Sequence, residues 1–235
     1  MPGRLYLVPN LLGAVPPSNV LPALTIEVAR GLRHFVAENA KVARAFLKTL
    51  ALEVPIQSID IALLNEHTAD SAVEALLAPA LAGNDVGLLS DAGCPAVADP
   101  GAKLVAAAHR RGVQVVPLVG PSSILLALMA SGMNGQGFAF HGYLPVKPEP
   151  RAVVLRGLEQ RVHREGATQI FIEAPYRNAT MLQAIGAACS SELLVAIAAD
   201  LTLPSEEIVA LPVAQWRKRD AARYQNRPAI FLLGR

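Results

Sequence analysis

The first part of the chain alternates short apolar runs with segments of helical spacing. Runs such as "RLYLV" at 4–8 and "DVGLLS" at 85–90 predict buried strands, and apolar residues that recur every three or four positions between them predict helices. Further strands are expected at 34–38, 58–64, 113–119 and 138–144, and helices at 24–31, 39–50, 68–83, 101–112 and 122–132. Such alternation is typical of a mostly parallel sheet with helices on both faces.

Local signals set the ends of two of these helices. Asn39 precedes a helical pattern and is predicted to cap it. Thr68 is expected to cap the helix at 68–83, Pro79 to kink or shorten it, and Gly83 to end it.

The pattern changes after a proline-rich segment. "YLPVKPEPR" at 143–151 predicts a linker between a domain at 1–143 and another at 150–235. Beyond it we expect a charged helix at 152–165, a strand at 168–174 and a helix opening at Pro175. Two more strands are expected at 192–200 and 206–211, then a short helix at 212–219 and a last strand at 228–234. The second domain is therefore predicted to be α+β with a mixed or antiparallel sheet.

Composition narrows the class of protein. The chain has 235 residues, of which 52% are hydrophobic, enough for a sizeable core. No window reaches the roughly 18 apolar residues of a membrane span, and the amino terminus lacks the features of a signal peptide, so we expect a soluble cytoplasmic protein without a membrane partner. The two cysteines and five histidines are scattered, so neither a disulfide framework nor a metal site is expected.

The net charge of +2 does not by itself demand a nucleic-acid partner. One segment, "WRKRDAARYQNR" at 216–227, nevertheless holds five basic residues and one acid. Its simpler interpretation is a solvated helix face followed by a turn. Its alternative is a patch that contacts RNA phosphates.

Two loops carry candidate chemistry. In "LLSDAGCPAVADPG" at 88–101, Asp91 directly follows a buried strand and offers a carboxylate to a ligand ammonium or hydroxyl, whereas Asp99 is placed to cap the next helix. In "VGPSSI" at 119–124, Ser122 and Ser123 open a helix, either as caps or as part of an anion or adenosine site. Both loops leave strands at the carboxyl edge, where open α/β sheets bind ligands.

A third segment, "FIEAPYRN" at 171–178, places Glu173 between a strand and a helix. Glu173 is interpreted as a cap or a general base, and Arg177 and Asn178 as residues that position a polar substrate. Cys94 has no histidine near it in the sequence, so we interpret it as a packing residue rather than a nucleophile.

Taken together, these motifs resemble the tetrapyrrole (corrin/porphyrin) methylase family of S-adenosylmethionine-dependent methyltransferases. The likeness is greatest to the branch that methylates ribose 2′-hydroxyls of small-subunit ribosomal RNA. "LLSDAGCPAVADPG" is similar to that branch's "LLSDAGTPxxSDPG", and "GRLYLVPN", "VVPLVGPSS", "FHGYLP" and "QIFIEAPYRN" match its other motifs in order. The resemblance covers nearly the whole chain, which would be a shorter, divergent member of the branch.

The resemblance implies two α/β domains that hold S-adenosylmethionine between them, in a homodimer. By motif, the first domain would contact the cofactor through Pro9, Asp91, Ala92, Gly93, Cys94, Ser122 and Ser123. The second would close over it through Phe171, Ile172, Pro228 and Ala229. The acids to test as a general base for a ribose hydroxyl are Glu173 and Glu38.

Departures from the branch lie on the presumed substrate side. "NLLGAVPPS" replaces "TPIGNLxD", "AENAK" replaces "AEDTR", and "AADLTLPSEE" replaces "ARELTKxHEE". Three functions therefore remain open: a methyltransferase acting on an RNA substrate, one acting on a tetrapyrrole or other small molecule, and a paralogue that binds the cofactor without catalysis.

Overall fold

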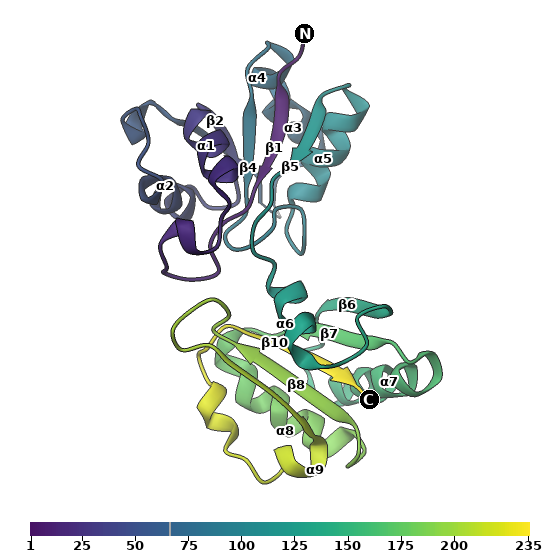
Figure 1. The fold of residues 1–235 in the computed structure, drawn as a ribbon. Coiled ribbons are helices and arrows are strands. Elements are labelled where there is room, and N and C mark those ends of the chain that lie inside the picture. Colours follow the sequence, from purple (N-terminus) through teal and green to yellow (C-terminus); the bar gives the residue numbers. More distant parts are fainter. Residues whose placement is uncertain (66) are drawn as a thin grey trace. The chain divides into compact units, whose positions relative to one another are not determined.

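The computed structural model describes residues 1–65 and 67–235. Within them the chain forms two compact units, Met1–Ser122 and Ser123–Arg235, each with a five-stranded sheet (Figure 1).

The sheet of the first unit is wholly parallel. Its strands run in the order β3-β2-β4-β1-β5, so β1 lies between β4 and β5. Their bounds are Arg4–Val8 (β1), His34–Ala37 (β2), Asp60–Leu63 (β3), Val86–Leu89 (β4) and Gln114–Pro117 (β5). All five were predicted from apolar runs. The parallel arrangement brings their carboxyl ends to one edge.

Helices cover both faces of this sheet. Tyr6, Val8 and Phe35 pack with α1 and α2, and the alternate residues Leu5 and Val36 pack with the helical segment from α3 to α4 and with α5. The helices are α1 (Ala23–Gly31), α2 (Ala40–Thr49), α3 (Asp70–Val73), α4 (Ala78–Leu81) and α5 (Gly101–Arg110), with 3-10 turns η1 (Pro17–Asn19), η2 (Ile56–Ser58) and η3 (Glu74–Leu77). The two cores follow from the period-two alternation along each strand.

The sheet of the second unit is mixed, as predicted. Its order is β6-β7-β10-β8-β9, with β6 parallel to β7 and the other neighbours antiparallel. The strands are β6 (Phe138–Tyr143), β7 (Thr168–Ile172), β8 (Leu194–Ala199), β9 (Glu207–Pro212) and β10 (Ala229–Gly234). The helices are α6 (Ser123–Ser131), α7 (Pro148–Glu165), α8 (Asn178–Ala188) and α9 (Val213–Trp216), with 3-10 turns η4 (Pro175–Arg177) and η5 (Ala221–Tyr224).

The main core of this unit joins one sheet face to α7, α8 and α9. Phe171 and Phe231 stack across β7 and β10 with centroids 5.5 Å apart and pack with residues such as Leu155, Met181 and Trp216. On α6, the buried residues are Ala127, Leu128 and Ser131, and this helix contacts β8, β9 and β10.

The boundary between the units differs from the predicted one. We expected it within 143–151, but it falls between Ser122 and Ser123, and β6 pairs with β7 in the second sheet. The prolines of 143–151 do not mark a linker between domains. Pro148 instead occupies the first turn of α7, where a missing backbone N–H costs no helical hydrogen bond.

The capping predictions had mixed outcomes. Asn39 caps α2, and its side chain accepts hydrogen bonds from the amides of Lys41 and Val42. Thr68 does not cap a helix: α3 has Ala69 as N-cap, and the Thr68 hydroxyl accepts from the Asn65 amide at 3.0 Å. The helix expected over 68–83 is divided into α3, η3 and α4, with Pro79 in the first turn of α4.

Candidate functional site

Three loops meet at the carboxyl edge of the first sheet. They follow β1, β4 and β5, which are neighbours in the sheet. The chain leaves β1 toward α1 on one face and leaves β4 toward α5 on the other, and such a divergence marks the ligand crevice of open α/β sheets. The edge contains the predicted cofactor residues Pro9, Asp91, Ala92, Gly93, Cys94 and Ser122.

Asn10 ties the first two loops together. Its backbone forms an antiparallel bridge with Gly93, with N···O distances of 2.9 and 3.2 Å. Its buried side-chain amide donates to the carbonyls of Ser90 and Asp91 at 3.0 and 3.1 Å, while its oxygen accepts from the Leu11 amide. Because these groups are satisfied away from water, the start of the 90–101 loop is held in one position.

The rest of this loop is fixed from within. Ser90 donates to the carbonyls of Ala92 and Gly93, and Asp99 accepts from the amides of Ala96 and Gly101 at 2.9 and 2.7 Å. Asp99 therefore binds the first amide of α5, that of Gly101, although the N-cap position of this helix is occupied by Pro100 and not by Asp99 as predicted. Ala96 and Ala98 have φ values of 64° and 60°, a left-handed conformation unfavourable for alanine. Strain of this kind persists only where the surroundings determine the backbone.

The loop after β5 completes the edge. A methyl group on Gly120 would lie 2.4 Å from Cβ of Pro9, so only glycine fits there. The Cys94 thiol donates to the Pro121 carbonyl at 3.5 Å, and the Thr25 hydroxyl in α1 donates to the Val119 carbonyl at 2.8 Å. Burial raises the pKa of Cys94, which fits a packing role better than a nucleophilic one.

Asp91 and Ala92 lie at the exposed tip of the fixed loop. Partial removal of the carboxylate from water raises the pKa of Asp91. An exposed carboxylate on a rigid loop is suited to accept hydrogen bonds from an ammonium or hydroxyl group of a ligand, because little side-chain or backbone freedom is lost on binding. Ser122 and Ser123, both half-buried, stand at the junction of the two units, and Ser123 begins α6.

In the second unit, the predicted cofactor residues lie at one end of the central strands. Ile172 is paired with Ile230, so Pro228 and Ala229 lie beside the end of β7. The Pro228 carbonyl accepts from the Asp200 amide at 2.9 Å. Ile172 is half-buried, Ala229 is buried and Pro228 is exposed.

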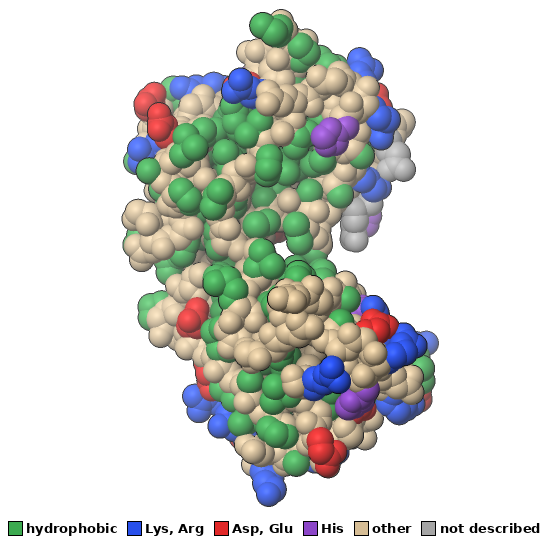
Figure 2. Space-filling model, turned by 45° about the vertical axis from the view of Figure 1, so that its right-hand side comes forward, with side chains coloured by type: hydrophobic (Ala, Val, Ile, Leu, Met, Phe, Trp, Pro, Cys, Tyr) green, Lys and Arg blue, Asp and Glu red, His purple; other side chains and the backbone are tan. Residues whose placement is uncertain are grey.

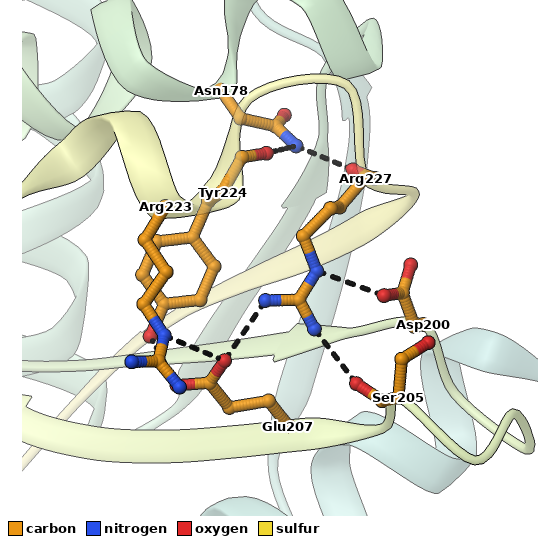
Figure 3. A network of polar contacts seen from close by, with 7 residues as sticks. All are labelled: Asn178, Asp200, Ser205, Glu207, Arg223, Tyr224 and Arg227. Carbon is orange, nitrogen blue, oxygen red and sulfur yellow. Dashed lines mark hydrogen bonds and ion pairs between the residues drawn. The ribbon is translucent and has the colours of Figure 1, made fainter.

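Arg227 holds the segment before Pro228 in place (Figure 3). Its guanidinium donates to Asp200, to Glu207 and to the Ser205 carbonyl, each at 2.8 Å. The guanidinium carbon also lies over the Tyr224 ring, 5.7 Å from the ring centre. Glu207 also accepts from Arg223 and from the Tyr224 hydroxyl, at 3.0 and 3.2 Å. These contacts connect the turn before β10 to the turn between β8 and β9.

Asn178 belongs to the same network rather than to a substrate site. Its side-chain nitrogen donates to the carbonyls of Tyr224 and Arg227 at 3.1 and 2.6 Å, and the residue is fully buried (Figure 3). The interpretation of Asn178 as a substrate-positioning residue is therefore wrong.

The two candidate bases have different surroundings. Glu173 is 4% exposed, and its Oε1 accepts from the Ala174 amide at 2.7 Å and from Arg177 Nε at 2.9 Å. Its Oε2 is buried without a hydrogen-bond partner among the described residues. Glu38 lies in the first unit, exposed, directly after β2. Oε1 of Glu173 is thus used in the ion pair with Arg177, and Oε2 is still able to accept a hydrogen bond.

The basic segment at 216–227 is largely used within the protein. Arg217 donates to the carbonyls of Gly186 and Cys189 and to the Ser191 hydroxyl, while Arg223 and Arg227 bind Glu207. On the face shown in Figure 2, Lys and Arg side chains are interspersed with acidic and uncharged ones. Because α9 ends at Trp216, these three arginines do not form the solvated helix face of the simpler interpretation. They bind groups of the protein itself.

Residues 1–65 and 67–235 include no cluster of three or more His, Cys, Asp or Glu residues that could hold a metal ion. None of the helices formed by these residues is long and apolar enough to cross a membrane.

Two residues at these sites have structural roles that the motifs did not indicate. Asn10 follows an apolar strand but its partners lie 80 and 81 residues away. Arg227 was counted only as part of a basic run, although it binds Asp200 and Glu207. The one local signal was the spacing of Glu173 and Arg177, four residues apart, which favours an ion pair.

Sequence comparisons show which known proteins this chain resembles. The family model for tetrapyrrole (corrin/porphyrin) methylases matches residues 25–216. A protein of Escherichia coli O157:H7, named ribosomal RNA small subunit methyltransferase I, is 30% identical over 235 residues, covering 99% of this chain and 78% of that protein. A protein of the same name from Xylella fastidiosa is also 30% identical, covering 99% of this chain and 81% of its own.

Among solved structures, the methyltransferase CobJ resembles this fold. It has a TM-score of 0.65 at 17% identity, covering 99% of this chain and 94% of that chain. The two-sheet α/β fold predicted from the sequence is thereby confirmed.

Proposed function

Because the chain belongs to the tetrapyrrole (corrin/porphyrin) methylase family and is an S-adenosylmethionine-dependent methyltransferase, we propose that it methylates a ribose 2′-hydroxyl of small-subunit ribosomal RNA. The observation that carries this proposal is that relatives named for that RNA match nearly the whole chain. Cytoplasmic localisation and a role in ribosomal RNA processing follow as parts of the proposal.

The proposed cofactor residues of the first unit are Pro9, Asp91, Ala92, Gly93, Cys94 and Ser122. The fit rests on the loop geometry: Gly93 has φ 69° and no side chain, and its backbone is anchored to Asn10. Asp91 offers the exposed carboxylate. A loop held in this way can bind a polar ligand with little reorganisation of the protein.

The proposed cofactor residues of the second unit are Ser123, Ile172, Pro228 and Ala229. Arg227 supports this role because its three hydrogen bonds fix the backbone directly before Pro228. The free Oε2 of Glu173, one residue beyond Ile172, is an orphaned acceptor for an N–H or O–H group of a ligand.

When bound, S-adenosylmethionine supplies a methyl group already activated on a sulfonium. The protein therefore has mainly to hold the acceptor oxygen in line with that group and to exclude water. Methylation of the 2′-oxygen would release the hydroxyl proton, so a residue of this chain or water would have to accept it.

Glu173 and Glu38 remain the proposed acceptors of this proton. For Glu173 only Oε2 is available, since Oε1 is bound to Arg177. A pH–rate profile of wild type and of Glu173→Gln separates the roles. A base predicts loss of the acidic limb together with a large fall in kcat, whereas an unchanged rate dismisses Glu173 as a base.

Calorimetric titration with S-adenosylmethionine and S-adenosylhomocysteine tests the cofactor site. We expect Asp91→Ala to weaken binding at least about 10-fold, because a hydrogen bond to a charged group contributes roughly 1.5–3 kcal/mol. Asn10→Ala should also weaken binding, because it removes the two hydrogen bonds that hold the loop at Ser90 and Asp91. Val97→Ala, which shortens an exposed side chain in the same loop, serves as control. Wild-type binding by both variants would place the cofactor elsewhere.

A tetrapyrrole acceptor is the second candidate. It is favoured by the internal use of Arg217, Arg223 and Arg227, which leaves fewer cations for RNA phosphates. Transfer of a labelled methyl group to small-subunit ribosomal RNA, measured against transfer to a porphyrinogen, decides between the two. RNA binding should also weaken steeply with salt.

We further propose that the protein forms a homodimer, as the family resemblance implies. Light scattering coupled to size-exclusion chromatography should give twice the chain mass of 24.8 kDa. A mass of one chain across micromolar concentrations would contradict this.

A further inference from the structure

Two exposed tyrosines stand at the same end of neighbouring strands in the second unit. Tyr143 ends β6 and is 64% exposed, and Tyr176 lies in η4, just after β7, and is 61% exposed. Tyr143 is paired with Ile172 at the end of β7. Both residues are within electrostatic reach of the Arg177 guanidinium, whose pKa is raised first by its hydrogen bond to Glu173 and further by these tyrosines.

The exposed Tyr176 is held by buried groups. Arg177 lies 5.2 Å from the centre of the Tyr176 ring and donates to its hydroxyl at 3.2 Å. Arg177 is in turn fixed by Glu173, whose side chain is fully buried. A cation over an aromatic face, anchored by a buried carboxylate, restrains the orientation of a ring that solvent would otherwise leave free.

The backbone of η4 is braced from a second direction. The Asn226 amide donates to the Pro175 carbonyl at 2.9 Å, and the Gln225 side chain donates to the Tyr176 carbonyl. Gln225 and Asn226 belong to the segment that Arg227 and Asn178 hold. The turn that carries Tyr176 is therefore restrained on both sides.

An irregularity in β6 sets the position of Tyr143. The register between β6 and β7 shifts between Phe140 and Tyr143, and Gly142 between them has φ 63°. Without the shift, position 142 would oppose Ile172. The extra residue brings Tyr143 to the end of β7 instead, and bulges commonly re-aim a side chain in this way near functional sites.

Scattered exposed aromatics need no explanation, but a pre-oriented one with a second beside it at one end of a sheet does. We propose that Tyr176, with Tyr143 beside it on the neighbouring strand, forms a stacking platform for an unpaired nucleobase of the RNA substrate. This proposal rests on the proposed RNA acceptor. RNA-binding proteins bind splayed bases on aromatic and guanidinium planes, and a rigid ring binds with little loss of conformational entropy.

The platform also assigns a role to Glu173 that differs from catalysis. Its ion pair with Arg177 positions the residue that supports Tyr176. Glu173→Gln would then weaken RNA binding, an effect that a purely catalytic base would not show.

The test uses the full chain and a single-stranded RNA oligonucleotide containing 2-aminopurine, whose fluorescence is quenched on stacking. We expect Tyr176→Ala to weaken RNA binding roughly 5- to 100-fold and to abolish part of the quenching, as base–aromatic stacking predicts. Tyr176→Phe should retain most of the affinity because it keeps the ring. S-adenosylmethionine affinity, measured by calorimetry, should be unchanged in both.

Phe138→Ala is the matched control. Phe138 is also an exposed aromatic of β6, 44% exposed, but lies at the opposite end of the strand from Tyr143. RNA binding should be unaffected. Because stacking releases few counterions, the loss caused by Tyr176→Ala should be similar at low and high salt.

Three outcomes would overturn the platform. If Tyr176→Ala and Tyr143→Ala both bind RNA as tightly as wild type, the tyrosines are not a stacking platform, while the proposed RNA methyltransferase function is unaffected. If wild type neither binds RNA nor transfers a methyl group to it, both the platform and the proposed RNA acceptor are contradicted. Dissociation of a wild-type dimer into monomers by Tyr176→Ala would show that the tyrosines form a protein contact instead.

Discussion

At the scale of single residues, the carboxyl edge of the first sheet depends on small side chains and on one amide. Gly120 lets the loop after β5 approach Pro9, and Asn10 occupies the space between two loops and satisfies their backbone groups. None of these residues carries reactive chemistry. Their effect is to hold the Asp91 loop in one conformation, on which the proposed cofactor affinity depends.

Gly120→Ala should lower the free energy of unfolding by about 1–3 kcal/mol, the usual cost of overpacking, because the added methyl would lie 2.4 Å from Pro9 Cβ. S-adenosylmethionine binding should weaken as the loop is displaced. Denaturant unfolding and calorimetry measure the two effects. Gly31→Ala is the control, since a methyl there meets nothing within 4 Å. Wild-type stability of Gly120→Ala would show that the loops yield without cost.

At the scale of elements, polar side chains close the ends of helices and connect turns. Asn39 caps α2 at its start, and Arg217 binds the carbonyls of Gly186 and Cys189 at the end of α8. The last carbonyls of a helix lack partners within it, and a cation there also interacts favourably with the helix dipole. A residue that composition assigns to a basic patch is therefore a helix cap.

Arg217→Ala should lower the free energy of unfolding by roughly 1–2 kcal/mol through loss of these hydrogen bonds. Lys218→Ala removes the same charge from the next, exposed position and should change stability by less than about 0.5 kcal/mol. Denaturant titration gives both values. If the segment bound RNA phosphates, both variants would weaken RNA binding and reduce its dependence on salt. If both variants lost the same unfolding free energy, Arg217 would not act as a helix cap.

At the scale of the whole molecule, each unit has its own sheet and core, and the second is held together by ionic contacts as well as by packing. Glu207 accepts from Arg227, Arg223 and Tyr224, so three residues of the segment 223–227 depend on its negative charge. The hydrogen bond from Arg227 is the largest cause that lowers the pKa of Glu207 below its ordinary value of 4.5.

A depressed pKa in the folded state makes stability depend on pH in a defined direction. The contribution of Glu207 is fully present above pH 4.5, its unfolded-state value, and is lost as pH falls through the lower folded pKa. Wild type should therefore lose more unfolding free energy below pH 4.5 than Glu207→Gln does, and the two curves should converge in acid. Denaturant unfolding over this range measures the difference.

Glu165→Gln provides the control for that experiment. The pKa of Glu165 is also lowered, first by Arg164, but the group is exposed and its ion pairs contribute little to stability. Asp91 and Asp99 have raised pKa values, so their effect on the pH dependence of stability has the opposite sign. They are present in wild type, Glu207→Gln and Glu165→Gln alike, so their effect cancels in the comparison. Parallel curves for wild type and Glu207→Gln would contradict a stabilising role for the Glu207 charge.

The sequence by itself determined what depends on neighbours along the chain. Apolar periodicity identified the strands of both sheets, and the Asn39 cap and the Asp99 contacts arise within three residues. Short-range signals of this kind are readable because backbone geometry fixes which nearby groups meet. The motif likeness added the family and its cofactor, though not which side chains hold the loops.

Only the tertiary structure decided the long-range partners. Asn10 reaches Ser90 and Asp91 because β1 lies between β4 and β5, and strand order is set by packing of the whole sheet. The unit boundary at Ser122 likewise depends on β6 pairing with β7, and the proline-rich 143–151 segment could not indicate it. Local patterns carry no information about which distant surface a side chain will meet, since that choice is made when separate elements bury their apolar faces together.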